Sequence, residues 1–308
     1  MVGAPPERAW QNAGVPITKC ASTDAFVAID LPDAPVAVGV VRCAKKILQD
    51  GATNLARTRT YTYAAFGEKV SGASAGINAE GDARDEAVGA FVTELADQVA
   101  AGSLRLAAAK GVSAEDLAPW ASTAAPSPEA AERALVASTL AALGAVRDLA
   151  GSTVAVELGA PSAEAIAAAA NAAGATATLV STDELLAGDA DTSWDAVVIG
   201  AKQGGVTHEN VARLGTATVI SAAPLSITAR GLANARKQGA TVLADFVTAA
   251  GPVLAELGHD DATIADKVAT VVAATKDHQE GAFLGACYHA EDFLRTWTAE
   301  LPFGRPMA

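Results

Sequence analysis

The chain has 308 residues, 51% hydrophobic and 19% charged, so it is long and apolar enough for two folded domains and is not a disordered protein. Its formal net charge of −13 opposes binding to nucleic acid phosphates. The sequence has no uninterrupted apolar run long enough to span a membrane, and Pro5, Pro6 and Glu7 stand where a secretory leader would be apolar. We expect a cytoplasmic protein that binds neither nucleic acid nor membranes.

In chain order, the first predicted elements are two short β-strands, residues 25–30 and 34–41, separated by a Leu-Pro-Asp turn. Residues 85–99 predict an amphipathic helix, because their apolar side chains fall on one stripe at helical spacing. Three prolines between residues 119 and 128 indicate a domain junction near Ala124. An alanine-rich helix then begins at Ser127-Pro128-Glu129 and runs to about Leu149.

The second half alternates short apolar strands with helices, a pattern typical of a parallel sheet covered on both faces. A helix is predicted over residues 162–173, and helical structure again over residues 260–297. The predicted strands are residues 153–157, 175–180, 194–200, 217–221 and 241–246. We therefore expect an α/β fold whose second domain is Rossmann-like and doubly wound.

The cysteines and histidines do not predict a metal site. Cys20, Cys43 and Cys287 are far apart and odd in number, which favours reduced thiols over a disulfide framework. Cys287, His289 and Asp292 lie close together in the sequence, but residues two apart on a helix point to different faces. We expect solvated or partly packed side chains there.

One segment carries a specific resemblance. Residues 59–67 read RTYTYAAFG and residues 71–77 read SGASAGI. The segment resembles the signature of the glutamate/leucine/phenylalanine/valine dehydrogenase superfamily, T-Y-K-N-A-A-x-G followed by G-G-G-K-x-x-I. Thr62 and Ser74, twelve residues apart, stand where that family has its two lysines. The resemblance continues from about Ala21 to Trp297, and the family's catalytic aspartate falls on Ala109.

The resemblance implies that the family's chemistry is lost. In the family one lysine fixes the substrate carboxylate, the second polarises the carbonyl or activates water, and the aspartate handles protons at nitrogen. Thr62, Ser74 and Ala109 supply neither a cation nor a general base. Lys69 and Lys110 lie near positions where the family has a catalytic residue and this sequence does not. Each of these two lysines is either a surrogate catalytic group or a surface lysine.

The resemblance also covers other residues that line the substrate cleft in the family. Arg42 stands where the family has the end of its G-G-x-R strand, and Asp116 and Asp245 persist from two further motifs. We expect these three residues to line the remaining cleft, although Arg42 and Asp116 could instead hold the domain together through hydrogen bonds. The asparagine that faces the nicotinamide in the family is replaced by Ala249.

The dinucleotide fingerprint is altered as well. The family's G-x-G-x-x-A/G aligns with residues 158–163, so that Leu158 and Ala160 place carbon where pyrophosphate lies. Gly159, Ser162 and Asp183 remain as the candidate cofactor-binding residues, with NAD(P) as the cofactor that the fold would take. Whether any nucleotide binds stays open at this point.

These patterns together favour a catalytically degenerate dehydrogenase-like protein with two domains. Residues 1–124 plus 284–308 would form a substrate and oligomerisation domain, and residues 125–283 a Rossmann-like domain. The role would be regulatory, binding or structural, in a homo-oligomer or in a hetero-oligomer with an active paralogue, with a small molecule as a further candidate ligand. The alternative is an NAD(P)-dependent oxidoreductase acting on an amino acid or a related small molecule with relocated catalytic groups.

Overall fold

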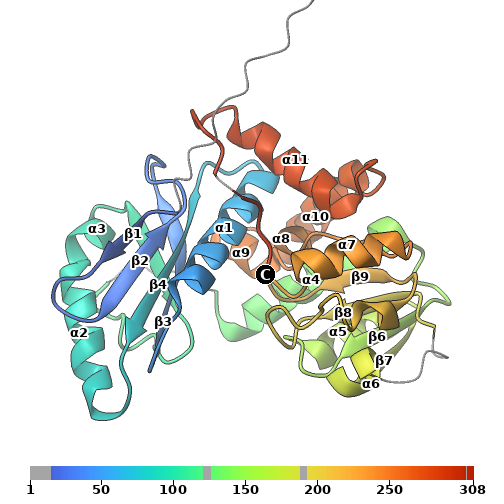
Figure 1. Cartoon of the computed structure of the whole chain (residues 1–308), viewed down its shortest axis with the longest axis horizontal. Coiled ribbons are helices and arrows are strands. Elements are labelled where there is room, and N and C mark those ends of the chain that lie inside the picture. Colours follow the sequence, from blue (N-terminus) through green and yellow to red (C-terminus); the bar gives the residue numbers. More distant parts are fainter. Residues whose placement is uncertain (1–14, 121–125, 188–192, 303) are drawn as a thin grey trace, which may run out of the picture.

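The computed structural model describes residues 15–120, 126–187, 193–302 and 304–308. It places them in two α/β lobes, each built on a five-stranded sheet, with the helix α1 between the lobes (Figure 1). The predicted fold class is confirmed. The predicted junction near Ala124 lies outside the described residues. Among the described residues, no helix is both long and apolar enough to cross a membrane.

The sheet of the first lobe is mixed. Its strands lie in the order β1 (Ile17–Lys19), β2 (Ala25–Ile29), β4 (Ser71–Asn78), β3 (Ala37–Ala44), β5 (Leu104–Ala108). β3 pairs in parallel with β4 and β5, whereas β2 is antiparallel to both of its neighbours. One face packs against α2 (Arg84–Glu94) and α3 (Ala96–Ala100), whose apolar residues share a core with that face. The opposite face lies against α1 (Gln49–Ala65).

The contact between α1 and β4 is unusually close. A Cβ atom added at Gly72 would lie 1.9 Å from the carbonyl oxygen of Ala56 and 2.7 Å from the amide nitrogen of Thr60. The Gly72 amide donates a hydrogen bond of 2.8 Å to Thr60 Oγ1. Only glycine lets the helix and the strand approach so closely, and this contact fixes the TYTYAA helix against the SGAS strand.

The sheet of the second lobe is wholly parallel, in the order β10-β9-β8-β6-β7. Its strands are β6 (Thr153–Glu157), β7 (Thr176–Val180), β8 (Ala196–Ile199), β9 (Thr218–Ser221) and β10 (Thr241–Val242). The accompanying helices are α4 (Pro128–Val146), α5 (Ala163–Ala172), α6 (Thr182–Ala187), α7 (Ala229–Lys237) and α10 (Asp261–Thr275). The strand order reverses between β6 and β8, which is the topological switch point where doubly wound folds bind ligands.

Three predicted elements differ from the structure. The helix over residues 85–99 breaks at buried Leu95 into α2 and α3. The last strand ends at Val242, because the chain turns into the short helix α8 (Asp245–Thr248). The helical segment over residues 260–297 is divided between α10 and α11 (Ala282–Leu294) by a loop that ends at Gly281, whose φ of 91° suits glycine.

The core of the second lobe extends onto α1, whereas the face of the first sheet that α2 and α3 cover has a core of its own. The Tyr61 ring of α1 meets Phe246 of α8 edge-on at 5.6 Å, and Phe246 meets Phe283 of α11 at 6.0 Å. The Tyr61 hydroxyl donates to Glu291 of α11 at 3.1 Å, and the same carboxylate accepts two hydrogen bonds from Arg305. Aromatic packing and a charged network thus hold α1, α11 and the last described residues together.

The close approach of α1 to β4 leads to a stability prediction. Gly72→Ala should lower the free energy of unfolding by at least about 2 kcal/mol, because its methyl group would overlap backbone atoms that cannot move independently. Gly89→Ala is the matched control, since Gly89 is exposed in α2 with nothing within 4 Å of the added atom, and it should stabilise by up to ~1 kcal/mol. Urea unfolding of both variants checks this, and equal effects would contradict the packing argument.

Candidate functional site

A cavity of about 310 Å³ lies between the lobes. Thr58, Arg59 and Thr62 of α1 form its wall on the side of the first lobe, together with parts of β3 and β4. The second lobe contributes the loop after β9 and the segment around α8, and these lining residues are Ala222, Ala223, Pro224, Asp245, Phe246, Ala249, Pro252 and Val253. The lining is mostly apolar, with two hydroxyls, one guanidinium and one carboxylate.

Thr62, which the sequence resemblance aligns with the family's first lysine, lines this cavity. Its side chain is buried, and its Oγ1 donates a hydrogen bond of 3.1 Å to the carbonyl oxygen of Thr58 one turn earlier in α1. The hydroxyl is therefore already satisfied within the helix. Thr62 brings no charge to the cavity and no group that could bind a carboxylate as a lysine does.

Ser74, which the sequence resemblance aligns with the family's second lysine, is hydrogen-bonded to an arginine from the neighbouring strand. Arg42 Nη2 donates to Ser74 Oγ at 3.2 Å, and Val40, two residues before Arg42, lines the cavity on the same face of β3. The Nε atom of Arg42 is buried without a hydrogen-bond partner among the described residues, and desolvation lowers the pKa of Arg42. The structure thus places a guanidinium beside Ser74, although neither residue lines the cavity.

Asp245 is the carboxylate of the cavity wall. It is buried, and it accepts hydrogen bonds from the backbone amides of Leu225 and Phe246, the second at 2.8 Å. Desolvation raises the pKa of Asp245 to about 6, although both hydrogen bonds act in the opposite direction. Leu225 has a φ of 60°, so Asp245 holds the loop after β9 in a conformation that is costly for leucine.

The other sequence candidates lie outside the cavity. Ala109 donates its amide to Val41 at the end of β5, and Lys69 and Lys110 are exposed; none of the three lines the cavity. Asp116 accepts hydrogen bonds from Arg84 and from Ser113, and these hold its pKa well below the usual range. Asp116 therefore fixes the loop of residues 111–116. This is the second of the two roles that the sequence allowed for Asp116, holding the domain together through hydrogen bonds.

Sequence reasoning missed an ion pair at the rim of the cavity. Arg59 Nη1 and Nη2 donate to the two carboxylate oxygens of Glu256 at 2.9 and 3.1 Å, and Glu256 ends α9 (Gly251–Glu256). Burial opposes the charge on Arg59, but Glu256 more than offsets this and raises the arginine pKa. Because the partners are 197 residues apart, no local pattern could have identified the pair. The guanidinium is neutralised by Glu256 and is not free for a ligand.

The crevice at the switch point of the second lobe holds a buried carboxylate. Glu157, the last residue of β6, is 4% exposed. Its Oε2 accepts hydrogen bonds from the amides of Gly200 and Ala201 at 2.8 and 2.9 Å, and its Oε1 accepts one from Thr182 Oγ1 at 2.7 Å. Glu157 thus joins the carboxyl ends of β6 and β8 to the start of α6, across the crevice where doubly wound folds bind dinucleotides.

The segment after Glu157 differs from the glycine-rich fingerprint at Leu158 and Ala160. Leu158 is 51% exposed, and a Cβ atom at Gly159 would lie 2.8 Å from the side chain of Ala201. Ser162 precedes α5 with a φ of 55° and makes no capping hydrogen bond. Asp183 is exposed in the first turn of α6, while Ser181 and Glu184 bond each other around that helix start. The side chains after β7 are used for helix capping.

Comparison with known proteins gives a likeness of structure only. No protein-family model matches the sequence, and no curated protein matches it. An L-tryptophan dehydrogenase from Nostoc punctiforme matches with a TM-score of 0.72 at 16% identity, over 91% of this chain and 95% of that chain. The leucine-bound hetero-hexameric glutamate dehydrogenase from Thermus thermophilus matches with a TM-score of 0.69 at 17% identity, over 90% and 86%. Another glutamate dehydrogenase gives 0.71 at 15%, over 90% and 82%.

The chain therefore has the fold of the amino-acid dehydrogenases, and the resemblance inferred from the sequence is confirmed at the level of the fold. Among the described residues, no group of three or more histidine, cysteine, aspartate or glutamate side chains is arranged to hold a metal ion.

The raised pKa of Asp245 predicts a pH effect on stability. A carboxyl group whose pKa is higher in the folded state than in the unfolded chain stabilises the fold most when it is protonated. The contribution of Asp245 is therefore fully present below about pH 4 and is lost as the pH rises through about 6. The test compares the free energy of unfolding of the wild type with that of Asp245→Asn. The wild-type value minus the variant value should fall by on the order of 3 kcal/mol as the pH rises from about 4 to about 6. Urea unfolding at a series of pH values measures the difference, and a constant difference would refute the assignment.

Proposed function

We propose that this chain is a catalytically degenerate protein of the amino-acid dehydrogenase fold, with a non-enzymatic role as a binding protein or as a regulatory subunit. The observation that carries the proposal is the position of Glu157. Its buried carboxylate accepts the Gly200 and Ala201 amides in the dinucleotide crevice, where a pyrophosphate would meet a like charge and would find those donors occupied.

The interlobe cavity supports the same proposal. Thr62 is satisfied within α1, and Arg59 is paired with Glu256, so neither offers a free cation to a substrate carboxylate. Arg42 donates a hydrogen bond to Ser74, which stands where the family has its second lysine. A guanidinium stays protonated and offers no lone pair, so Arg42 could bind an anion but could not act as a general base. The alternative oxidoreductase therefore lacks a proton-transfer group at this cavity, apart from Asp245 on the opposite wall.

We further propose that the chain works in an oligomer, either of identical chains or together with an active paralogue, assembled through the lobe of residues 1–124 and 284–308. One structural neighbour is described as a hetero-hexameric glutamate dehydrogenase, so unlike chains can assemble in this fold. A subunit without its own chemistry could contribute its assembly surface and its ligand sites to such a complex.

Calorimetric titration with NADH and NADPH tests the loss of cofactor binding. The wild-type chain should show no saturable heat at micromolar nucleotide, with or without added amino acids, because the crevice presents Glu157 and lacks two glycines of the fingerprint. An active amino-acid dehydrogenase run under the same conditions serves as the positive control. Micromolar binding would overturn the proposed loss of the nucleotide site.

Native mass spectrometry tests the assembly. The purified chain should appear as a complex of several identical copies, or it should co-purify with an intact paralogue when both are expressed together. A single copy under both conditions would contradict the proposed subunit role. The cofactor result and this result are independent, so either part of the proposal can fail alone.

A further inference from the structure

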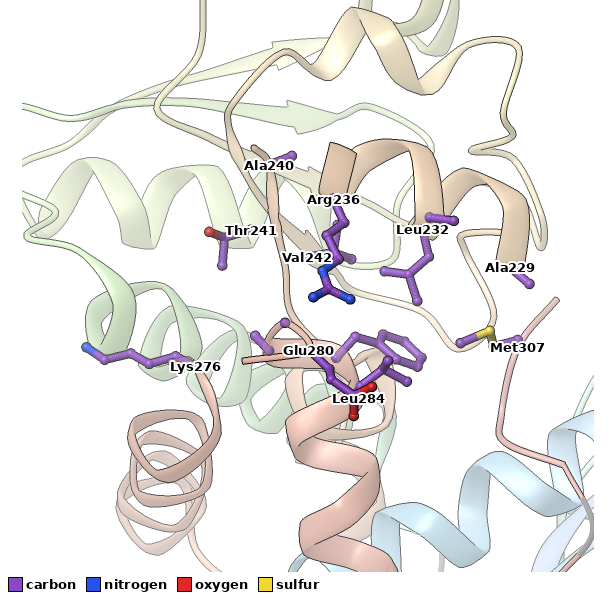
Figure 2. A pocket seen from close by; sticks show the side chains of 14 residues that line it. Ala229, Leu232, Arg236, Ala240, Thr241, Val242, Lys276, Glu280, Leu284 and Met307 are labelled. Atoms are coloured by element: carbon purple, nitrogen blue, oxygen red, sulfur yellow. The ribbon is translucent and has the colours of Figure 1, made fainter. Parts of the chain in front are cut away.

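A second cavity, of about 350 Å³, lies between the Rossmann-like lobe and C-terminal residues of the chain. It is bounded by α7, by the edge strand β10, by the first turn of α11 and by Met307 (Figure 2). None of its lining residues lines the interlobe cavity, so the two are separate sites. Its volume falls in the range of small-molecule pockets, which is roughly 300–1,000 Å³.

The wall of this cavity is predominantly apolar. Leu232 projects from α7, Val242 belongs to β10, Phe283 and Leu284 come from α11, and Met307 closes one side (Figure 2). Alanines at positions 229, 233, 240 and 282 leave the space open. A ligand that fills it must therefore carry an apolar body of a few carbon atoms.

One guanidinium enters this apolar space. Arg236 extends from the last turn of α7 toward the loop that precedes α11 (Figure 2). Its Nη2 donates to the carbonyl oxygen of Gln279 at 2.8 Å, and among the ion pairs of the described residues none joins Arg236 to a carboxylate. The remaining donors of its planar fork are suited to a carboxylate.

Two other charged residues complete the wall. Lys276 lies at the far end of the cavity, where its Nζ donates to the carbonyl oxygen of Ala145 at 2.9 Å (Figure 2). Glu280 supplies the one carboxylate of the lining, and no ion pair joins it to Arg236 or Lys276 in the described chain. The first turn of α11 contains no acidic residue. The cavity thus carries two cations and one anion, although the chain as a whole has a net charge of −13.

We propose that this cavity binds a small apolar carboxylate, whose carboxyl group is held by Arg236 and whose hydrocarbon part lies against Leu232, Phe283 and Met307. Two kinds of molecule share this chemistry: a short branched carboxylic acid, and an amino acid with an apolar side chain. Only the amino acid carries an ammonium group, and the carboxylate of Glu280 would accept hydrogen bonds from it. The assignment does not depend on the proposed loss of catalysis, because it rests on a different cavity.

Calorimetry on the full-length chain tests the proposal with 4-methylpentanoate and L-leucine as probes. Saturable binding of at least one probe at millimolar concentration or below is expected. Acetate lacks the hydrocarbon body and 4-methylpentan-1-ol lacks the charge, so both should bind far more weakly. If leucine binds more tightly than 4-methylpentanoate, and Glu280→Gln removes the difference, the ligand is an amino acid; equal affinities indicate the carboxylic acid. No saturable binding of either probe would overturn the proposal.

Variants locate the bound probe. Arg236→Gln should weaken binding by about tenfold or more, the typical effect of losing a charged hydrogen bond. Arg230→Gln is the matched control, because Arg230 is exposed on the same helix and does not line the cavity; its affinity should equal that of the wild type. Ala233→Trp places a bulky ring at the exposed edge of the cavity and should abolish binding, while its thermal midpoint shows whether it folds. Binding that survives both Arg236→Gln and Ala233→Trp would place the probe elsewhere and refute the assignment.

Discussion

The structure depends on the packing of α1 between the two lobes. On one side Gly72 lets the helix lie directly on β4, and on the other Tyr61 packs against Phe246 and donates to Glu291. The interlobe cavity therefore has one wall built by α1 itself. Any group at position 62 is placed in the cavity by this packing, so the chemistry available there is set by the residue type at that position.

Both arginines of α1 serve the structure of this protein. Arg57 pairs with buried Asp30 at 2.7 Å and also donates to the carbonyl oxygen of Gly304, while Arg59 holds Glu256. The helix thus presents guanidinium groups to protein carboxylates and a neutral threonine to the cavity. Glu157 plays a comparable part in the second lobe, because it joins strand ends at the switch point of the parallel sheet. In both places a buried charge is paired or hydrogen-bonded within the chain, which offsets the cost of burying it.

The sequence predicted the parts of the fold that follow from local patterns. The α/β alternation, the strands of the parallel sheet and the helix behind Ser127 all appear, and Ser127 caps α4 as its position suggested. The strand predicted over residues 241–246 was too long, because Asp245 is bonded to the loop after β9 and the chain turns there. Composition and periodicity carry no information about such tertiary hydrogen bonds.

The candidate site was predictable only in part, for the same physical reason. Motif spacing singled out Thr62, Asp245 and Arg42; Thr62 and Asp245 line the cavity, whereas Arg42 bonds Ser74 and is not a lining residue. Glu157 was missed because it ends a buried strand, and its partners Gly200 and Ala201 are 43 and 44 residues further along the chain. The cavity at Arg236 is formed by segments from three parts of the chain, none of which resembles a binding motif.

The most direct test of the central claim is a spectrophotometric assay of nicotinamide reduction with NAD and NADP against a panel of amino acids. The account predicts no turnover above a control without enzyme, because the cavity lacks a free lysine and the crevice is occupied by Glu157. Amino-acid-dependent reduction that scales with protein concentration, and that is lost on substitution of Arg42 or Asp245, would contradict it.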